Sequence, residues 1–417
     1  KIIGITGTKG KSSVAHLLTQ LLTLSGHRVL LIGTTGIHFA NEHKITDNTT
    51  PESLVIQEAM ADALAKGATH LVIELSSQAL AMQRSYGLQP DLACFLNLSP
   101  DHIGALEHPD FADYLNSKLK VFKGAKNCLF NLDDPAAAKL LKAALEALPK
   151  KQAGQLAAFG FGSPQELEQG LSRIAREAGF QGAELEEVLT RVQLYGGEEL
   201  KFTSQNLSFI FQQKQISLEP AAAFLAANAL ATLASLDLLG ELNEDLIAAI
   251  AKLHVPGRLE KIKTSKGAVI VIDYAHNELS LEALLAALKP QVKGRLLVLF
   301  GSVGEKSKER RRELPRVAER YADFVYVSSD NPGFEDPEKI VQEIGAQFSP
   351  DFKNYDLEAD RELAIRRAVR SLRAGDLLVL AGKGHEKFQL VKGEHLAFDE
   401  RAIVESELAA IAEDLKA

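Results

Sequence analysis

Apolar strand-like segments alternate with amphipathic helical segments from the first residue onward, and this order limits the possible folds more than any other feature. Strand-like segments occupy residues 1–6, 28–35, 70–76, 91–99 and 127–134, with helical patterns at 12–26 and 51–67. A helix between two strands allows the second strand to return parallel to the first. The first part of the chain therefore predicts an α/β fold with a mostly parallel sheet.

A second alternating series follows a more mixed middle segment. Residues 200–218 alternate in twos, as antiparallel strands do, and helical patterns follow at 219–236 and 243–253. After "HVPGRLE", where Pro256-Gly257 could form a hinge, strand-like runs return at 268–274, 295–302, 323–329 and 376–384. We therefore predict a central domain over 1–256 and a Rossmann-like α/β domain over 257–417. Ligands of such sheets bind at the carboxyl ends of the strands, so we expect an active site between the two domains.

Composition excludes several classes of function. Of 417 residues, 55 are acidic and 47 are basic, so electrostatic capture of nucleic acid is not expected. Because no apolar run is long enough to cross a bilayer and no signal peptide is visible, we expect a cytoplasmic protein without a membrane partner. Cys94 and Cys128 stand inside apolar runs and are expected to be buried free thiols.

The first strand-like segment ends in a glycine-rich loop followed by a helical pattern. The loop consists of Gly7, Thr8, Lys9, Gly10, Lys11, Ser12 and Ser13. Glycines let backbone N–H groups approach phosphate oxygens, Lys11 can reach the terminal phosphates of a nucleotide, and the Ser12 hydroxyl can bind Mg²⁺. Ile5 stands where the longer phosphate-loop consensus has its first glycine, so this loop is a shorter variant.

Two further polar groups follow later strand-like segments. Glu74 closes residues 70–76, and Asp101 and His102 follow residues 91–99. A carboxylate and an imidazole near a phosphate loop suggest a second Mg²⁺ site that would neutralise charge between an anionic substrate and the γ-phosphate. The alternative is a surface acid and a polar residue at the start of a helix.

Several motifs occur in an order that resembles the Mur ligase family. They are "GITGTKGKSS", "TTPES", "IELSSQAL", "NLSPDH", "VIDYAHN", "SSDNPGFEDP" and "AGKGHEKFQ", and the resemblance runs from residue 2 to about residue 401. Within the family they are most similar to the branch that adds the third amino acid to a UDP-muramoyl dipeptide. The resemblance implies that ATP phosphorylates a substrate carboxylate, that an amine attacks the acyl phosphate, and that phosphate leaves as the amide forms.

The resemblance also implies roles for individual residues. Residues Gly7 to Ser13 would bind the phosphates of ATP, and Asn228, Arg258, Asp273 and His276 would complete the nucleotide site. Magnesium would be held by Ser12, Glu74, His102 and an N-carboxylated Lys118, for which Lys120 is the competing candidate and an ordinary solvated helix lysine the alternative. The acyl substrate would contact Asn48, Thr49, Thr50, Ser76 and Arg84, and the incoming amino acid would contact Lys306, Asn331, Gly382 and Glu386.

The chain departs from the family pattern at the acceptor site. Gly333 stands where enzymes that add diaminopimelate carry an arginine after "DNP", and Lys306 stands where they usually carry another. Without the guanidinium there is no bidentate clamp for a distal carboxylate, so lysine, ornithine or another acceptor is at least as well supported. Met82, Gln78 and Leu225 also replace a glutamine, a histidine and an asparagine that family members carry near the substrates.

Other functions stay open at this point. The family's usual uridine-diphosphate domain would precede the phosphate loop, and we expect it to be absent from this sequence. A ligase acting on a different carboxylate, as folylpolyglutamate synthases do, is therefore one alternative. A P-loop ATPase switch and an inactive homologue are the others, although the presence of Lys11, Glu74, His102 and Lys118 argues against the last.

Overall fold

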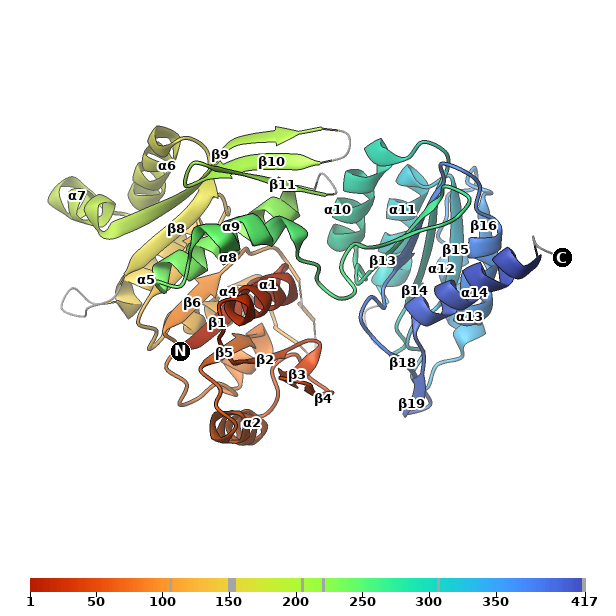
Figure 1. Cartoon of the computed structure of the whole chain (residues 1–417), viewed down its shortest axis with the longest axis horizontal. Helices are drawn as coiled ribbons and strands as arrows, with labels where there is room; N and C mark the ends of the chain where they lie inside the picture. The colour runs from red at the N-terminus through yellow and green to blue at the C-terminus, as the bar shows by residue number, and fades with distance from the viewer. Residues whose placement is uncertain are drawn as a thin grey trace. The chain divides into compact units, whose positions relative to one another are not determined.

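The computed structural model contains two compact units, each described here on its own (Figure 1). It describes residues 1–101, 103–104, 107–148, 155–203, 206–219, 222–305 and 308–414. Unit 1 comprises Lys1–Glu219 and Ala223–Leu253, and unit 2 comprises Pro220–Ala222 and His254–Ala417. The predicted boundary at 256/257 stays a prediction, although the division between the units lies only three residues earlier.

Unit 1 contains eleven strands and nine α-helices among its described residues. The strands are β1 (Ile2–Thr6), β2 (Val29–Gly33), β3 (Gly36–Phe39), β4 (Glu42–Lys44), β5 (His70–Glu74), β6 (Leu92–Phe95), β7 (Cys128–Asn131), β8 (Leu156–Phe161), β9 (Val192–Phe202), β10 (Leu207–Phe211) and β11 (Lys214–Leu218). The helices are α1 (Lys11–Leu24), α2 (Ser53–Ala65), α3 (Ser77–Ala81), α4 (Phe111–Leu119), α5 (Ala137–Ala147), α6 (Pro164–Glu177), α7 (Gly182–Arg191), α8 (Ala223–Leu238) and α9 (Glu244–Ala249), with 3-10 turns η1 (Lys120–Phe122) and η2 (Ile250–Lys252).

The sheet of unit 1 has a parallel centre and antiparallel edges. Its order is β11-β10-β9-β8-β7-β6-β1-β5-β2-β3-β4, and all neighbours from β9 to β2 run parallel. The hairpins at both edges pair antiparallel, which confirms the expectation for residues 200–218. Because the central strands are parallel, the carboxyl ends of β1, β2, β5 and β6 all lie at the same end of the sheet.

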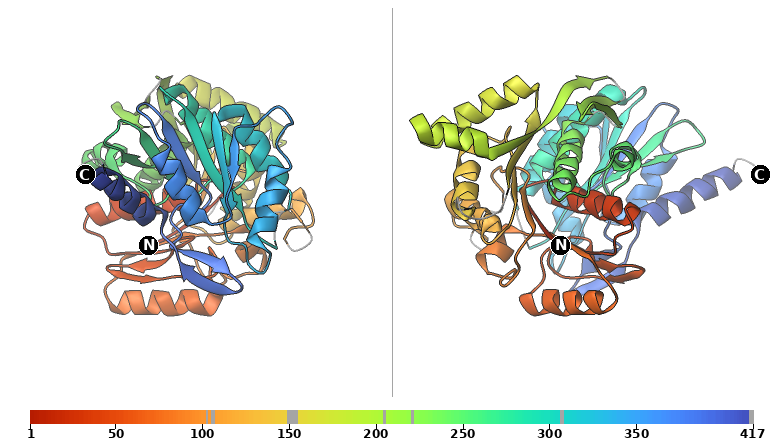
Figure 2. Two further views of the ribbon diagram at one scale, coloured as in Figure 1. Left: turned by 90° about the vertical axis from the view of Figure 1, so that its right-hand side faces the viewer. Right: turned by 60° about the vertical axis from the view of Figure 1, so that its left-hand side comes forward.

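Helices cover both faces of this sheet, as a parallel sheet requires (Figure 2). Helices α1 and α8 pack against each other, and α1 also contacts β2 and β5. An apolar cluster joins strand residues to α2, α4, α5 and α6. Cys94 and Cys128 are buried free thiols, as predicted.

Unit 2 contains a second sheet and a separate hairpin. Its strands are β12 (Glu260–Lys263), β13 (Val269–Asp273), β14 (Leu296–Ser302), β15 (Phe324–Ser329), β16 (Tyr355–Leu357), β17 (Leu377–Ala381), β18 (Phe388–Val391) and β19 (Glu394–Ala397). Its helices are α10 (Glu278–Leu288), α11 (Arg310–Tyr321), α12 (Pro337–Gly345), α13 (Arg361–Arg370) and α14 (Glu400–Asp414), with η3 (Lys289–Gln291).

The second sheet has the order β12-β13-β17-β14-β15-β16, and only β12 runs antiparallel to its neighbour. One apolar cluster joins its strands to α10, α11 and α12, and another joins them to α13 and α14. The predicted α/β class with two mostly parallel sheets is confirmed. Across the described parts of both units, every helix is too short or too polar to span a membrane.

Candidate active site

The glycine-rich loop joins the carboxyl end of β1 to the first turn of α1. Gly10 is the N-cap residue of the helix with φ of +85°, and as a glycine it has no side chain to cap the first turn. Side chains do cap α3, α4, α9 and α10. The helix dipole favours negative charge at the start of α1, so this position is suited to bind an anion.

Asn97, which the sequence reasoning missed, holds this loop in shape. Its side-chain oxygen accepts from Lys9 N at 2.8 Å, and its amide nitrogen donates to Lys9 O at 3.0 Å. Thr8 N donates to the Asn97 backbone oxygen at 2.9 Å. The Lys9 ammonium in turn donates to Asp101 at 3.0 Å. Asn97 belongs to the "NLSPDH" motif, so its place in the sequence was the available signal.

Asn228, expected at the nucleotide, lies on α8 directly behind the phosphate loop. Its side chain is buried, and a Cβ added to Gly10 would lie 2.5 Å from Asn228 Oδ1. Asn228 O accepts from the Thr232 hydroxyl at 2.7 Å. The adenine contact predicted for Asn228 stays a prediction, but its amide packs against the loop predicted to bind the phosphates.

Replacement of Gly10 by alanine is expected to weaken nucleotide binding about tenfold. The left-handed backbone costs a Cβ-bearing residue about 1–2 kcal/mol, and the new Cβ would also displace the Asn228 amide. Gly26→Ala is the matched control, because Gly26 has the same φ of +85° with no heavy atom within 4 Å of its would-be Cβ. Calorimetric titration with Mg²⁺-ADP measures both variants, and equal affinities would contradict the steric argument.

Glu74 ends β5 with a fully buried carboxylate beside the start of α1. Its Oε2 accepts from the Ser12 hydroxyl at 2.9 Å, and its Oε1 accepts from Thr34 N at 2.9 Å. The Thr34 hydroxyl, which the sequence reasoning missed, donates to Oε2 at 3.1 Å. This set of hydroxyl and carboxylate oxygens fits the ligand preference of Mg²⁺. The predicted ligand His102 and the predicted acceptor contact Lys306 both lie outside the described residues.

Two lysine side chains converge on the carbonyl oxygen of Gly7. Lys11 Nζ donates to it at 2.9 Å, and Lys118 Nζ donates to it at 2.8 Å. Lys118 is 2% exposed, and its amine lies 4.8 Å from the centre of the Tyr114 ring. Burial holds the pKa of Lys118 well below the ordinary lysine value, and the charge of Lys11 lowers this pKa further. Lys120, the competing candidate, is exposed.

Four of the five residues expected at the acyl substrate form one hydrogen-bonded cluster beside β5. The Thr50 hydroxyl donates to Glu74 O at 2.8 Å and accepts from Ser76 N at 3.0 Å, while Arg84 donates to Thr50 O at 3.1 Å. Thr49 contacts the Thr34 hydroxyl at 3.1 Å. Asn48, the fifth, is exposed next to Thr49. Thr34 and Glu74, which bond to this cluster, also bond to each other in the group of candidate magnesium ligands.

In unit 2, the three residues expected at the nucleotide gather where β13 ends. Asp273 accepts from Leu259 N and from Ala275 N, both at 2.8 Å. Burial raises the pKa of Asp273, against the opposing charge of Arg258. The Arg258 guanidinium lies 4.7 Å from the Tyr274 ring centre, and the His276 ring bonds to Tyr274 O at 2.8 Å. The expected position of the active site between the two domains stays a prediction.

The residues expected at the amino acid acceptor meet at the ends of β15 and β17. Asn331 donates to Glu386 Oε2 at 3.1 Å, and Gly382 N donates to Asp273 O at 3.0 Å. Lys383, which the sequence reasoning missed, is fully buried between them. Its ammonium donates to Glu386 at 2.8 Å and to Asn331 at 2.9 Å. The Lys383 ammonium therefore neutralises part of the negative charge of Glu386.

Gly333 faces a carboxylate rather than an open site. Its φ is +61°, and a Cβ placed there would lie 2.5 Å from Glu305 Oε2. Glu305 also accepts from Phe334 N at 3.4 Å. Glu305 therefore puts negative charge at the point where an arginine side chain would begin.

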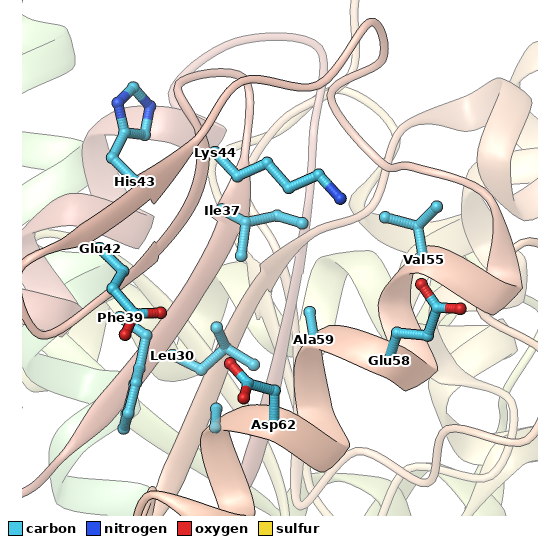
Figure 3. A pocket seen from close by; sticks show the side chains of 11 residues that line it. Leu30, Ile37, Phe39, Glu42, His43, Lys44, Val55, Glu58, Ala59 and Asp62 are labelled. Carbon is cyan, nitrogen blue, oxygen red and sulfur yellow. The ribbon is translucent and has the colours of Figure 1, made fainter.

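A cavity of about 300 Å³ lies elsewhere in unit 1, between the β3–β4 hairpin and α2 (Figure 3). Leu30, Ile37 and Phe39 form its apolar part, and Glu58 and Asp62 of α2 supply acidic groups. None of the predicted site residues that the structure describes lines it. The cavity is therefore not the candidate active site.

Comparison with known proteins agrees with this geometry. The Mur ligase middle domain matches residues 5–236, and the Mur ligase, glutamate ligase domain matches residues 257–384. A UDP-N-acetylmuramyl-tripeptide synthetase of Ligilactobacillus salivarius is 35% identical over 94% of this chain and 75% of its own length. A UDP-N-acetylmuramoyl-L-alanyl-D-glutamate–L-lysine ligase of Streptococcus sanguinis is 33% identical, over 95% of this chain and 75% of its own length.

A solved structure gives the same result for the fold. It is a UDP-N-acetylmuramoyl-L-alanyl-D-glutamate–2,6-diaminopimelate ligase with a TM-score of 0.63 and 28% identity, and the match covers 99% of this chain and 79% of that one. The first family match includes the glycine-rich loop, and the second includes the predicted acceptor residues except Glu386, which lies two residues beyond its end. The two family models match residues 5–236 and 257–384, and Glu74 and Lys118 lie buried beside the glycine-rich loop. The chain therefore belongs to the Mur ligase family.

Proposed function

We propose that this chain is an ATP-dependent, ADP-forming ligase that joins the carboxylate of a UDP-muramoyl dipeptide to an amino acid in cell-wall synthesis. The observation that carries the proposal is the meeting of Lys11, Ser12, Glu74 and Lys118 around one phosphate loop. Family membership supports the reaction class.

The first step transfers the γ-phosphoryl group of ATP to a carboxylate oxygen of the acyl substrate, and ADP leaves. Both reactants are anionic, so the site must supply positive charge. The backbone N–H groups at the start of α1 and the Lys11 ammonium would bind the phosphates. Ser12 and Glu74 would hold Mg²⁺, which supplies charge neutralisation on the phosphate oxygens when bound.

The second step forms the amide. The α-ammonium group of the incoming amino acid first loses one proton to give the amine. The amine attacks the carbonyl carbon of the acyl phosphate, inorganic phosphate leaves with the bridging oxygen, and the nitrogen loses a second proton. Glu386 is suited to hold the α-ammonium group before the first of these losses, and Asn331 fixes the Glu386 carboxylate by donating to it at 3.1 Å.

Lys118 is proposed to react with CO₂ to form a carbamate, with release of one proton. The reaction needs the neutral amine, and burial of Lys118 favours that form. A carbamate on this side chain would place carboxylate-like oxygens beside the phosphate loop, where they could join Glu74 as ligands of Mg²⁺.

The acceptor is proposed to be an amino acid with a cationic or neutral side-chain end, lysine or ornithine before diaminopimelate. A distal carboxylate would approach the Glu305 carboxylate beside Gly333 without an arginine at position 333 to bind it. A distal ammonium group would instead be attracted to Glu305.

Phosphate release with ATP and Mg²⁺ tests these assignments in a matrix of substrates. UDP-N-acetylmuramoyl-L-Ala-D-Glu is combined with lysine, ornithine or diaminopimelate, and a folate with glutamate is run in parallel. We expect release that depends on the dipeptide and on lysine or ornithine. Release with diaminopimelate alone would overturn the acceptor proposal, and release with folate and glutamate would move the acyl substrate to that class. Release that ignores every amine and carboxylate would indicate an ATPase switch.

Replacement of Glu305 by glutamine is expected to raise KM for the cationic acceptor about two- to fivefold, with little change in kcat. The side chain is exposed, so its electrostatic contribution is limited to about 0.5–1 kcal/mol. Glu338→Gln removes an exposed carboxylate from the first turn of α12, five residues after Gly333, and serves as the control. An unchanged KM in Glu305→Gln would remove Glu305 from the acceptor site.

A further inference from the structure

Two histidines and a glutamate meet in unit 1 at the end of the sheet where β5 begins, opposite the end that carries the glycine-rich loop. His27 follows α1, His70 opens β5 and Glu241 follows α8 (Figure 1). Glu74 closes the same strand that His70 opens, so the two residues are about 13 Å apart along β5. The cluster is therefore separate from the candidate active site.

The distances within the cluster match those between ligands of one metal ion. His27 Nε2 lies 2.9 Å from Glu241 Oε2, and His70 Nε2 lies 3.5 Å from Glu241 Oε1. One ligand atom from each residue can be chosen so that all three lie within 4.8 Å of one another. Ligands at 2.0–2.1 Å from a tetrahedral zinc ion are about 3.3 Å apart, so small side-chain movements would bring all three to it.

The buried ring of His70 points an unpartnered nitrogen into the cluster. Its side chain is 4% exposed, and Nε2 has no hydrogen-bond partner among the described residues. Nδ1 lies 2.9 Å from the Thr69 hydroxyl, which already donates to Arg28 O at 3.3 Å. In the tautomer with the proton on Nδ1, the Thr69 oxygen accepts that proton and the lone pair stays on Nε2, where a metal ion could bind it. Metal-binding histidines are oriented by the same kind of bond from their other nitrogen.

The other two ligands are presented by matching helix ends. Gly26 lies two residues after α1 with φ of +85°, and Gly240 lies two residues after α8 with φ of +71°. In each case the next residue bonds back into the helix, His27 N to Leu22 O at 3.0 Å and Glu241 N to Leu236 O at 2.8 Å. This helix-ending motif fixes the backbone from which both side chains project.

The ammonium group of Lys1 contributes positive charge to this cluster. Lys1 Nζ forms an ion pair with Glu241 Oε1 and donates to Leu239 O at 2.9 Å. Because Leu239 O can keep the ammonium, Glu241 can turn to a metal ion without leaving Lys1 with no acceptor. Lys1 is thus a competitor of the metal rather than a block to it.

We propose that His27, His70 and Glu241 form a binding site for Zn²⁺. Two imidazole nitrogens and one carboxylate oxygen suit this ion, and three protein ligands leave the fourth position to water. The bound ion would join the end of the phosphate-loop helix α1, the start of β5 and the end of α8. The site lies at the opposite end of β5 from Glu74, so the ion would link these three elements and would not contact the substrates of the ligase.

Titration of the full chain with Zn²⁺ in the presence of saturating Mg²⁺ tests the site. We expect one Zn²⁺ per chain, a higher melting temperature with Zn²⁺, and a tetrahedral absorption spectrum when Co²⁺ replaces it. His27→Ala and Glu241→Gln should each weaken binding by about 100-fold or more, since losing a ligand should cost more than losing a group that only orients a ligand by a hydrogen bond. The side chains of His27 and Glu241 are 27% and 15% exposed, so both variants should fold.

Two further variants make the outcome decisive. Lys1→Met should tighten Zn²⁺ binding because it removes the competing ammonium, and His395→Ala, an exposed histidine of unit 2, should bind like the parent. No stoichiometric binding to the parent chain, or unchanged affinity in both His27→Ala and Glu241→Gln, would overturn the proposal. The readouts are metal binding and stability, so they do not depend on which substrate the ligase uses.

Discussion

Replacement of Lys118 by methionine is expected to lower the rate of ligation about 10²–10³-fold while the free energy of unfolding stays the same or rises. The rate falls because the proposed carbamate and its charge at the phosphate loop are lost. Stability does not fall, because methionine fills a similar volume without the cost of burying an amine. Gly7 O keeps a donor, since Lys11 Nζ bonds to it at 2.9 Å. Phosphate release and urea denaturation measure the two quantities.

Lys120→Met is the control for this experiment. Lys120 is exposed two residues further along the chain, so its loss should change neither quantity measurably. Incorporation of ¹³C-labelled bicarbonate by the parent but not by Lys118→Met would identify the carbamate directly. Full activity in Lys118→Met, or no label in the parent, would refute the carbamate.

The same lysine should give stability a defined pH dependence in CO₂-free buffer. Because burial lowers the pKa of Lys118, the folded state binds fewer protons than the unfolded state between that lowered pKa and about 10.5. The contribution of Lys118 to stability therefore rises with pH across this window. Lys118→Met should remove that rise, and denaturation curves at several pH values measure it.

Replacement of Arg361 by methionine is expected to destabilise unit 2 by about 3–5 kcal/mol, since it leaves a buried carboxylate without its partner. Arg361 donates to Glu400 Oε1 at 2.8 and 2.9 Å, and both side chains are almost fully buried. It also donates to Ser329 O and Ala381 O, the last residues of β15 and β17. Because the next residues lead into the acceptor site, KM for the amino acid should rise as well.

Two comparisons separate the buried charge from general damage. Arg361→Met with Glu400→Leu should recover part of the lost stability, because no unpaired carboxylate remains. Arg367→Met, on the same helix but 48% exposed, should cost less than about 1 kcal/mol. A loss in Arg361→Met no larger than in Arg367→Met would contradict the assignment.

Because of Glu400, the stability of the Arg361→Met variant should also depend on pH differently from that of the parent. Burial raises the pKa of Glu400, and Arg361 opposes the shift, so removal of Arg361 should raise this pKa further. An acid with a raised pKa binds more protons in the folded state, so its contribution to stability is lost as pH rises through that pKa. As pH rises above about 4.5, the ordinary pKa of a glutamate, Arg361→Met should therefore lose more stability than the parent does.

The parts of the site that the sequence could predict are those in which local chemistry is nearly complete within one segment. Gly7 to Ser13 were predicted to bind phosphate because strand, glycines and helix start are consecutive, and the structure shows that strand, loop and helix. Glu74 was singled out because it ends an apolar strand, and it does end β5. Thr34, Asn97 and Lys383 were missed, since each acts through a partner distant in the chain and looks alone like an ordinary polar loop residue.

The sequence by itself determined the α/β class, the antiparallel segment near residue 210 and the glycine-rich loop between a strand and a helix, because periodicity and glycine spacing act over a few residues. Only the tertiary structure decided that Lys118 rather than Lys120 is buried beside Gly7 and that Glu305 faces Gly333. It also brought His27, His70 and Glu241 together at the end of the sheet where β5 begins. The physical reason is that burial and charge depend on which strands become neighbours, and the order β6-β1-β5-β2 does not follow the order of the chain.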